Sequence, residues 1–247
     1  MAALAIICAL VGGWEAYAQW GGVDDFILPA PSEIAAALFD DRSLLLRDTL
    51  VTAQEIVFGL VIALILGALL ALVMHLSKAL RGAAWPLLVA SQAIPVAVIA
   101  PLLVTWWGFG IAPKLFVVAI VCYFPVVVTT LGALRSIDPD LHKLLRTLGA
   151  TRWQRMRYAE IPAALPAALA GAKIAVAIGS IAAVFAEYTG SSEGLGHQLL
   201  RSLPQLETAR AWAAVVILAA LSLICFYALQ FAERHLAPWA HRRKDHV

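Results

Sequence analysis

The chain has 247 residues, of which 62% are hydrophobic and only 14% are charged, and its mean hydropathy is +0.85. Soluble globular domains carry roughly 45–50% apolar and about 25% charged residues, so this chain has too little charge to cover a water-exposed surface. These values exclude a soluble, disordered, collagen-like or disulfide-rich secreted chain and indicate a membrane protein. The formal net charge of +2 gives no reason to expect nucleic acid as a partner.

Six mostly apolar stretches, each close to the 20 residues that a span requires, predict an all-α polytopic membrane protein. The spans are expected at about residues 1–23, 52–76, 84–107, 113–134, 162–187 and 210–232. The first stretch has neither a basic leader nor a small-residue cleavage site, so we predict a span rather than a cleaved signal peptide. No internal repeat is visible, and residues 1–247 are interpreted as one membrane domain.

The charged segment between the first two spans contains one short helical pattern. Pro31, Ser32 and Glu33 precede an apolar run, which predicts a helix along the membrane surface with Ser32 as its N-cap.

The distribution of Lys and Arg between the spans predicts that both termini face the cytoplasm. In this orientation twelve basic residues lie on the cytoplasmic side: Lys78, Arg81, Arg135, Lys143, Arg146, Arg152, Arg155, Arg157, Arg234, Arg242, Arg243 and Lys244. Five lie on the external side: Arg42, Arg47, Lys114, Arg201 and Arg210. Lys173 lies within the fifth span.

The longest cytoplasmic loop, residues 135–161, predicts an amphipathic helix. Four leucines recur at helical spacing, and the opposite side is basic, with His142, Lys143 and Arg146. Gly149 is placed to end this helix, and Pro162 suits the first turn of the next span. The residues alone fit two interpretations, a surface helix held against anionic lipid or a docking element for a cytoplasmic partner.

This loop resembles a known family. Gly149, followed after nine residues by Ala159-Glu160-Ile161-Pro162, is similar to the "EAA…G…I-LP" loop of the membrane permease subunits of bacterial ABC importers. The resemblance is to the nitrate/sulfonate/taurine-type permeases, a group that includes permeases for thiamine-precursor pyrimidines. It extends over roughly residues 28–200 through Leu28–Glu33, Ala93–Pro95, Trp107–Gly110, Phe124–Val127 and Ser192–Gly196. Lys143-Leu144-Leu145 replaces the family's Glu-Ala-Ala, so we expect altered charge contacts with the partner.

The resemblance implies a type I ABC importer permease in the bacterial inner membrane, with a cytoplasmic coupling helix that docks on a separate ATPase dimer. It also implies an external solute-binding protein and a second permease copy, which we expect to be a homodimer. The implied function is inward movement of a small solute, either a sulfonate-, nitrate- or taurine-like anion or a pyrimidine, by alternating access. The implied coupling residues are Leu141, Leu144, Leu145, Leu148, Gly149, Ala150, Arg152, Trp153 and Pro162.

The chain has no P-loop, because none of its five lysines follows a glycine. ATP and Mg²⁺ are therefore expected on the partner chain, and we predict no catalytic residue, cofactor or metal site here. Cys8, Cys122 and Cys225 lie singly in apolar runs, which predicts neither a disulfide nor a metal site.

Four polar residues within the spans are candidates for a substrate path, because polar groups at membrane depth are costly. Gln92 and Tyr123 lie near prolines and either form interhelical hydrogen bonds or contact substrate. Lys173 either extends toward the cytoplasmic surface or contacts the path or the second permease. Glu187 lies about 21 Å farther along the helix, too far to pair with Lys173, and is either held by a loop or part of a gate.

The main alternative is an ion-coupled secondary transporter. Such a protein should show inverted repeats and carboxylates at the membrane midplane, and we see neither in the sequence. An intramembrane enzyme would need paired ionisable groups within the bilayer, and these spans offer none.

Overall fold

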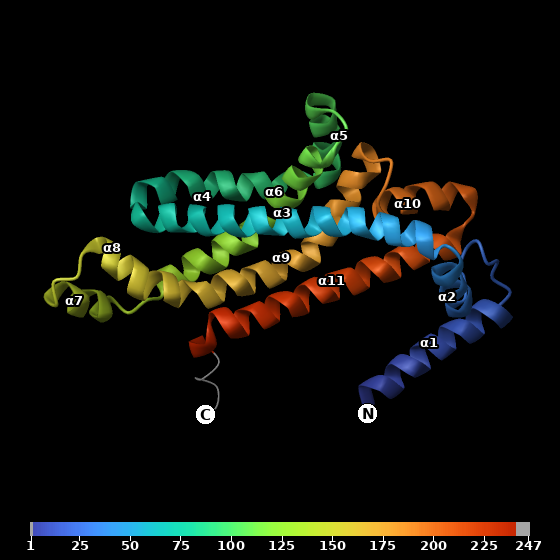
Figure 1. The fold of residues 1–247 in the computed structure, drawn as a ribbon, viewed down its shortest axis with the longest axis horizontal. Coiled ribbons are helices and arrows are strands. Elements are labelled where there is room, and N and C mark those ends of the chain that lie inside the picture. Colours follow the sequence, from blue (N-terminus) through green and yellow to red (C-terminus); the bar gives the residue numbers. More distant parts are fainter. Residues whose placement is uncertain (1, 241–247) are drawn as a thin grey trace.

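A computed structural model describes residues 2–240, with side chains from residue 4 onward, and every regular element in this part is helical (Figure 1). This confirms the predicted all-helical fold. The basic residues Arg242, Arg243 and Lys244, which contributed to the predicted orientation, lie outside the described residues.

Five elements run along the long axis of the molecule: α3 (Arg42–Leu76), α4 (Lys78–Ala93), α6 (Ile111–Arg135), α9 (Ile161–Gly190) and α11 (Thr208–Leu236) (Figure 1). At one end, here called the α7 end, lie α7 (Pro139–Thr147) and α8 (Arg152–Arg155), and a π-helical turn, η1 (Met156–Glu160), joins α8 to α9. At the other, the α10 end, lie α2 (Pro31–Asp40) and α10 (Leu195–Ser202). The remaining elements are α1 (Ala2–Trp20), α5 (Val96–Trp107), η2 (Leu203–Gln205) and η3 (Pro238–Ala240).

Four helical stretches among the described residues are long and apolar enough to cross a membrane: Arg42–Leu76, Ile111–Arg135, Arg152–Gly190 and Thr208–Leu236. They contain the expected spans at 52–76, 113–134, 162–187 and 210–232, each extended at its ends. Helix α1 coincides with most of the expected first span, and the total of six spans stays a prediction.

The expected span at 84–107 is broken into two helices. Helices α4 and α5 meet at an angle of 94° across Ile94 and Pro95, so α5 projects from the bundle (Figure 1). Pro95 has no amide hydrogen and cannot continue the hydrogen bonding of α4. Apolar composition alone did not reveal this break, because both halves are apolar.

Small residues allow the long helices to pack closely. A Cβ atom on Gly67 would lie 2.8 Å from Cβ of Val126, and one on Gly171 would lie 2.8 Å from the carbonyl oxygen of Pro125. Neither site has room for a side chain, so α3, α6 and α9 approach at nearly backbone distance, as helices do in membranes. The main core lies among these three helices.

Helices α1 and α2 are connected by a carboxylate. Ser32 donates from its hydroxyl to Glu15 at 2.6 Å and from its backbone N–H at 3.0 Å. The prediction of Ser32 as the N-cap was wrong, because the N-cap is Ala30, two residues earlier, and α2 begins at Pro31. There Glu33 accepts the Ala30 N–H at 2.9 Å.

Candidate functional site

Helix α7 forms the tip of the molecule and has no buried residue (Figure 1). Its start is fixed by the Asp138 side chain, which accepts the Asp140 N–H at 2.8 Å. Gly149 follows its end with φ +76°, a left-handed conformation that favours glycine. The Gly149 N–H donates to the Arg146 carbonyl and the Ala150 N–H to the Leu145 carbonyl, both at 2.9 Å. The predicted ending of this helix at Gly149 is confirmed.

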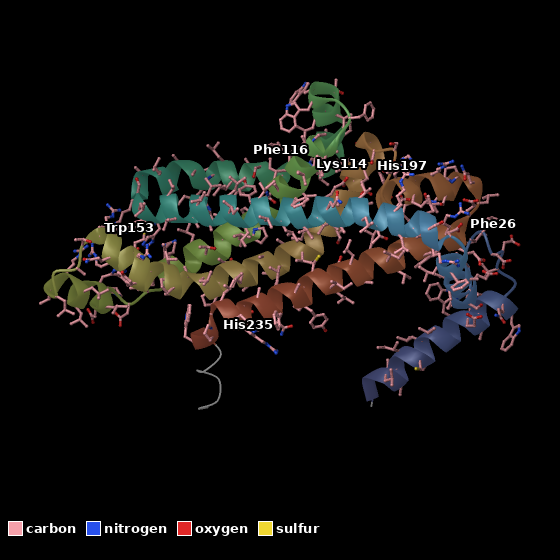
Figure 2. The ribbon with its side chains drawn as sticks, in the orientation of Figure 1. Phe26, Lys114, Phe116, Trp153, His197 and His235 are labelled. Atoms are coloured by element: carbon pink, nitrogen blue, oxygen red, sulfur yellow. The ribbon has the colours of Figure 1, made fainter. Side chains whose placement is uncertain are left out.

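The leucine stripe of α7 is largely open to its surroundings. Leu144 and Leu148 are 56% and 73% exposed, whereas Leu145 is half-buried. Leu141, Leu145 and Leu148 line one side of a groove of about 570 Å³, and α8 and η1 supply the other side. The indole of Trp153 on α8 is also exposed, at the same end of the molecule (Figure 2). Exposed apolar groups gathered in this way are typical of a protein-binding surface.

The second half of the predicted loop is helical and continuous with the following span. Thr151 caps α8 by accepting the Gln154 N–H at 3.3 Å, and the Gln154 side chain accepts the Thr151 N–H at 2.8 Å. Arg152 fastens this segment to α3 by donating to the Leu76 carbonyl at 3.0 Å. Pro162 lies in the first turn of α9, as predicted.

Glu160 connects the tip to the bundle. Its carboxylate lies 3.2 Å from Nε2 of His75 on α3 and 3.5 Å from Nδ1 of His142 on α7. Glu160 is only 7% exposed, so this contact is largely shielded from solvent. Displacement of α7 would therefore pull on α3 and α9 together. The sequence analysis did not identify this contact, although an acidic residue at the junction of a basic loop and a span is an available signal.

At the α10 end, Glu187 is fully buried and fixes a loop. It accepts the Thr52 hydroxyl and the Gly196 N–H, each at 2.5 Å. Asp48 on α3 accepts the Gly194 N–H at 3.0 Å. Of the two alternatives for Glu187, these contacts match a loop-held carboxylate.

A buried ion pair lies beside Glu187 and was not expected from the sequence, which offered no paired ionisable groups within the spans. Lys114 of α6 donates to Glu55 of α3 at 2.5 Å and to the Ser191 hydroxyl at 2.8 Å. Glu55 is 1% and Lys114 6% exposed. We had counted Lys114 only as an external positive charge. Its place at the start of a span was the available signal, because such a cation needs a partner once buried.

Lys173 has a partner that neither alternative considered. Its ammonium group donates to Glu233 of α11 at 2.6 Å, which ties α9 to α11. The pair is mostly buried, with side chains 19% and 12% exposed.

Gln92 and Tyr123 lie beside the break between α4 and α5. The Tyr123 hydroxyl lies 2.6 Å from that of Ser91, and Gln92 donates to the Ile120 carbonyl at 3.1 Å. Tyr123 lines an apolar cavity of about 570 Å³, whereas Gln92 lines a separate one of about 210 Å³. The four candidate path residues therefore do not converge on one cavity in a single chain. Gln92 and Tyr123 are neighbours, and Lys173 and Glu187 belong to separate networks.

Comparison with known proteins identifies the family of this chain. Residues 60–242 match the family described as "Binding-protein-dependent transport system inner membrane component". The formylaminopyrimidine transport permease protein ThiX of Halalkalibacterium halodurans is 35% identical over 93% of this chain and 92% of its own. The taurine transport system permease protein TauC of Escherichia coli is 25% identical over 94% of this chain and 87% of its own.

Solved structures show the same fold. A chain from the inward-facing MetNI methionine ABC transporter has a TM-score of 0.64 and 17% identity, covering 80% of this chain and 96% of its own. At that identity the likeness concerns the fold, which is that of type I ABC importer permeases. The chain thus belongs to the binding-protein-dependent transport system inner membrane components, the permease subunits of ABC importers.

Proposed function

We propose that this permease carries a small heteroaromatic solute of the pyrimidine type inward. Transport is driven by a separate ATPase dimer that binds α7. The family implies both an ATPase and a solute-binding protein as partners. The observation that carries the proposal is the exposed leucine surface at the α7 end, because an unburied amphipathic helix needs a partner.

The geometry supports a role for α7 in transmitting movement of the ATPase to the membrane-crossing helices. Glu160 lies just before α9, within the continuous helix Arg152–Gly190, and contacts His142 on α7 and His75 on α3. A push on α7 is therefore transmitted to two membrane-crossing helices as rigid bodies. Alternating access needs only such a two-state rearrangement, biased by a ligand that binds one state more tightly.

The α7 end is assigned to the cytoplasm, with both termini on that side. Lys78, Arg81, Arg135 and Arg146 lie at this end of the bundle, in agreement with the excess of basic residues expected in cytoplasmic segments.

A second copy of the chain is proposed to cover the break between α4 and α5. Gln92, Ile94 and Pro95 are exposed on a single chain, although this break lies among apolar helices. Irregular backbone and a side-chain amide are tolerated at membrane depth only against protein or a water-filled path. A homodimer with this break facing its interface would cover both groups with protein and would place Gln92 beside the solute.

The proposed substrate class rests on the sequence relatives and on the residues that line the cavity beside the break between α4 and α5. The relative named for formylaminopyrimidine transport is 35% identical, whereas the one named for taurine is 25% identical. No free cation accompanies Gln92 among the described residues that line its cavity, so this surface does not favour an anion such as a sulfonate. An amide beside apolar side chains suits a neutral heteroaromatic ring.

The test is co-purification and transport with Leu148→Asp, a substitution on an exposed side chain that should leave the bundle folded. We expect loss of ATPase association and at least a tenfold drop in ATP-dependent uptake of formylaminopyrimidine into proteoliposomes that contain the cognate binding protein. Leu200→Asp, on an exposed leucine of α10 at the other end, is the matched control and should retain ATPase association.

Two results would overturn the proposal. Normal ATPase association of the Leu148→Asp protein would refute the docking of the ATPase on α7. Uptake without ATPase or ATP would favour an ion-coupled transporter. Uptake of taurine in preference to the pyrimidine, with normal coupling, would refute only the substrate class.

A further inference from the structure

A cavity of about 720 Å³ lies behind α7, on the side away from the leucine groove. It is open to the surroundings and is lined by the basic face of α7, the ends of α3 and α6, the start of α4, and α8. Figure 2 shows nitrogen-bearing side chains gathered at this end of the molecule, near Trp153. Six cations that line it have no carboxylate partner within residues 2–240: Lys78, Arg81, Arg135, Arg146, Arg152 and Arg155.

One of these arginines has a buried donor without an acceptor. The Nε atom of Arg155 is inaccessible to solvent and makes no hydrogen bond within the described residues. Buried N–H groups are nearly always hydrogen-bonded, so an acceptor is missing at this place. Glu160, which also lines the cavity, is engaged by the two histidines His75 and His142.

We propose that this cavity binds a phosphate-bearing anion, held by the lysines and arginines that line it without a carboxylate partner among the described residues. Guanidinium groups match phosphate oxygens in pairs, and several cations from separate segments can surround one dianion. The volume is that of a small-ligand site. Leu76, Leu134 and Ile137 give the cavity an apolar part, which suits the glycerol of a lipid headgroup or the carbon skeleton of a soluble phosphate ester.

The arrangement of the cations favours such an anion over an acidic protein surface. They come from separate segments and line one recess, so a small dianion can contact several of them at once. A protein partner instead has the exposed leucines on the other side of α7. Bound phosphate would neutralise the repulsion among α7, α4 and α6 and so stabilise one position of α7.

The experiment uses the purified full-length chain and two separate phosphate sources. In one arm, nanodiscs of phosphatidylcholine with a minor fraction of phosphatidylglycerol are analysed for lipid retained by the protein. In the other arm, inorganic pyrophosphate is titrated into protein in zwitterionic detergent. The variants are Arg81→Gln/Arg135→Gln and, independently, Lys78→Gln/Arg146→Gln. The control is Arg42→Gln/Arg201→Gln at the α10 end.

We expect both cavity variants to bind about 25-fold more weakly than the control, since each basic residue near a phosphate contributes about fivefold. Selective retention of phosphatidylglycerol identifies a lipid headgroup, and saturable pyrophosphate binding identifies a soluble anion. Either result supports the site. Equal affinity of cavity and control variants, or no binding in both arms, overturns it. Loss of ATPase association without any anion binding also overturns it and would assign the recess to the protein interface.

Discussion

Substitution of Lys114 by Met should strongly destabilise the permease. The substitution leaves the Glu55 carboxylate, 1% exposed, without the ammonium group that lies 2.5 Å from it. Breaking a buried ion pair from one side costs about 3–5 kcal/mol, because a buried charge is left uncompensated. For a chain of this size that loss corresponds to a fall in melting temperature of about 10 °C.

The assay is thermal unfolding in detergent micelles, followed by circular dichroism, for both single variants and the double variant Glu55→Leu/Lys114→Met. The double variant should regain most of the lost stability, because neither charge then remains buried. Lys143→Met is the control, since its pair with Asp140 is 76% and 78% exposed and is worth less than about 1 kcal/mol. The reasoning is refuted if the losses of the two single variants simply add in the double variant.

Two further predictions concern helix packing and assembly. Gly171→Leu should lower the free energy of unfolding by about 3 kcal/mol, because its Cβ would lie 2.8 Å from the Pro125 carbonyl oxygen. Gly132→Leu is the control and should cost less, because a Cβ atom there meets nothing within 4 Å. Equal melting temperatures for the two variants would contradict this. Ile94→Cys, in a background without native cysteines, should form covalent dimers on oxidation, whereas Val216→Cys on α11 should not. Monomer alone from Ile94→Cys would argue against a homodimer that meets at the break.

The sequence sufficed for the features that depend on composition and local pattern. Long apolar runs required membrane-crossing helices, because no other structure satisfies a lone backbone segment in lipid. Gly149 follows the end of α7 and Pro162 lies in the first turn of α9 as expected, since each depends on the backbone preference of one residue. The exposed leucines of α7 likewise followed from their spacing.

The features that depend on several segments meeting were decided only by the tertiary structure. Lys114 is separated by 59 residues from Glu55, and Lys173 by 60 from Glu233, so no local pattern could pair them. Hydropathy did not reveal the break at Ile94 and Pro95, because α4 and α5 together have the length and composition of one span. Hydropathy reports where a helix prefers lipid to water, but a buried charge finds its partner only where the packed helices bring the two side chains together.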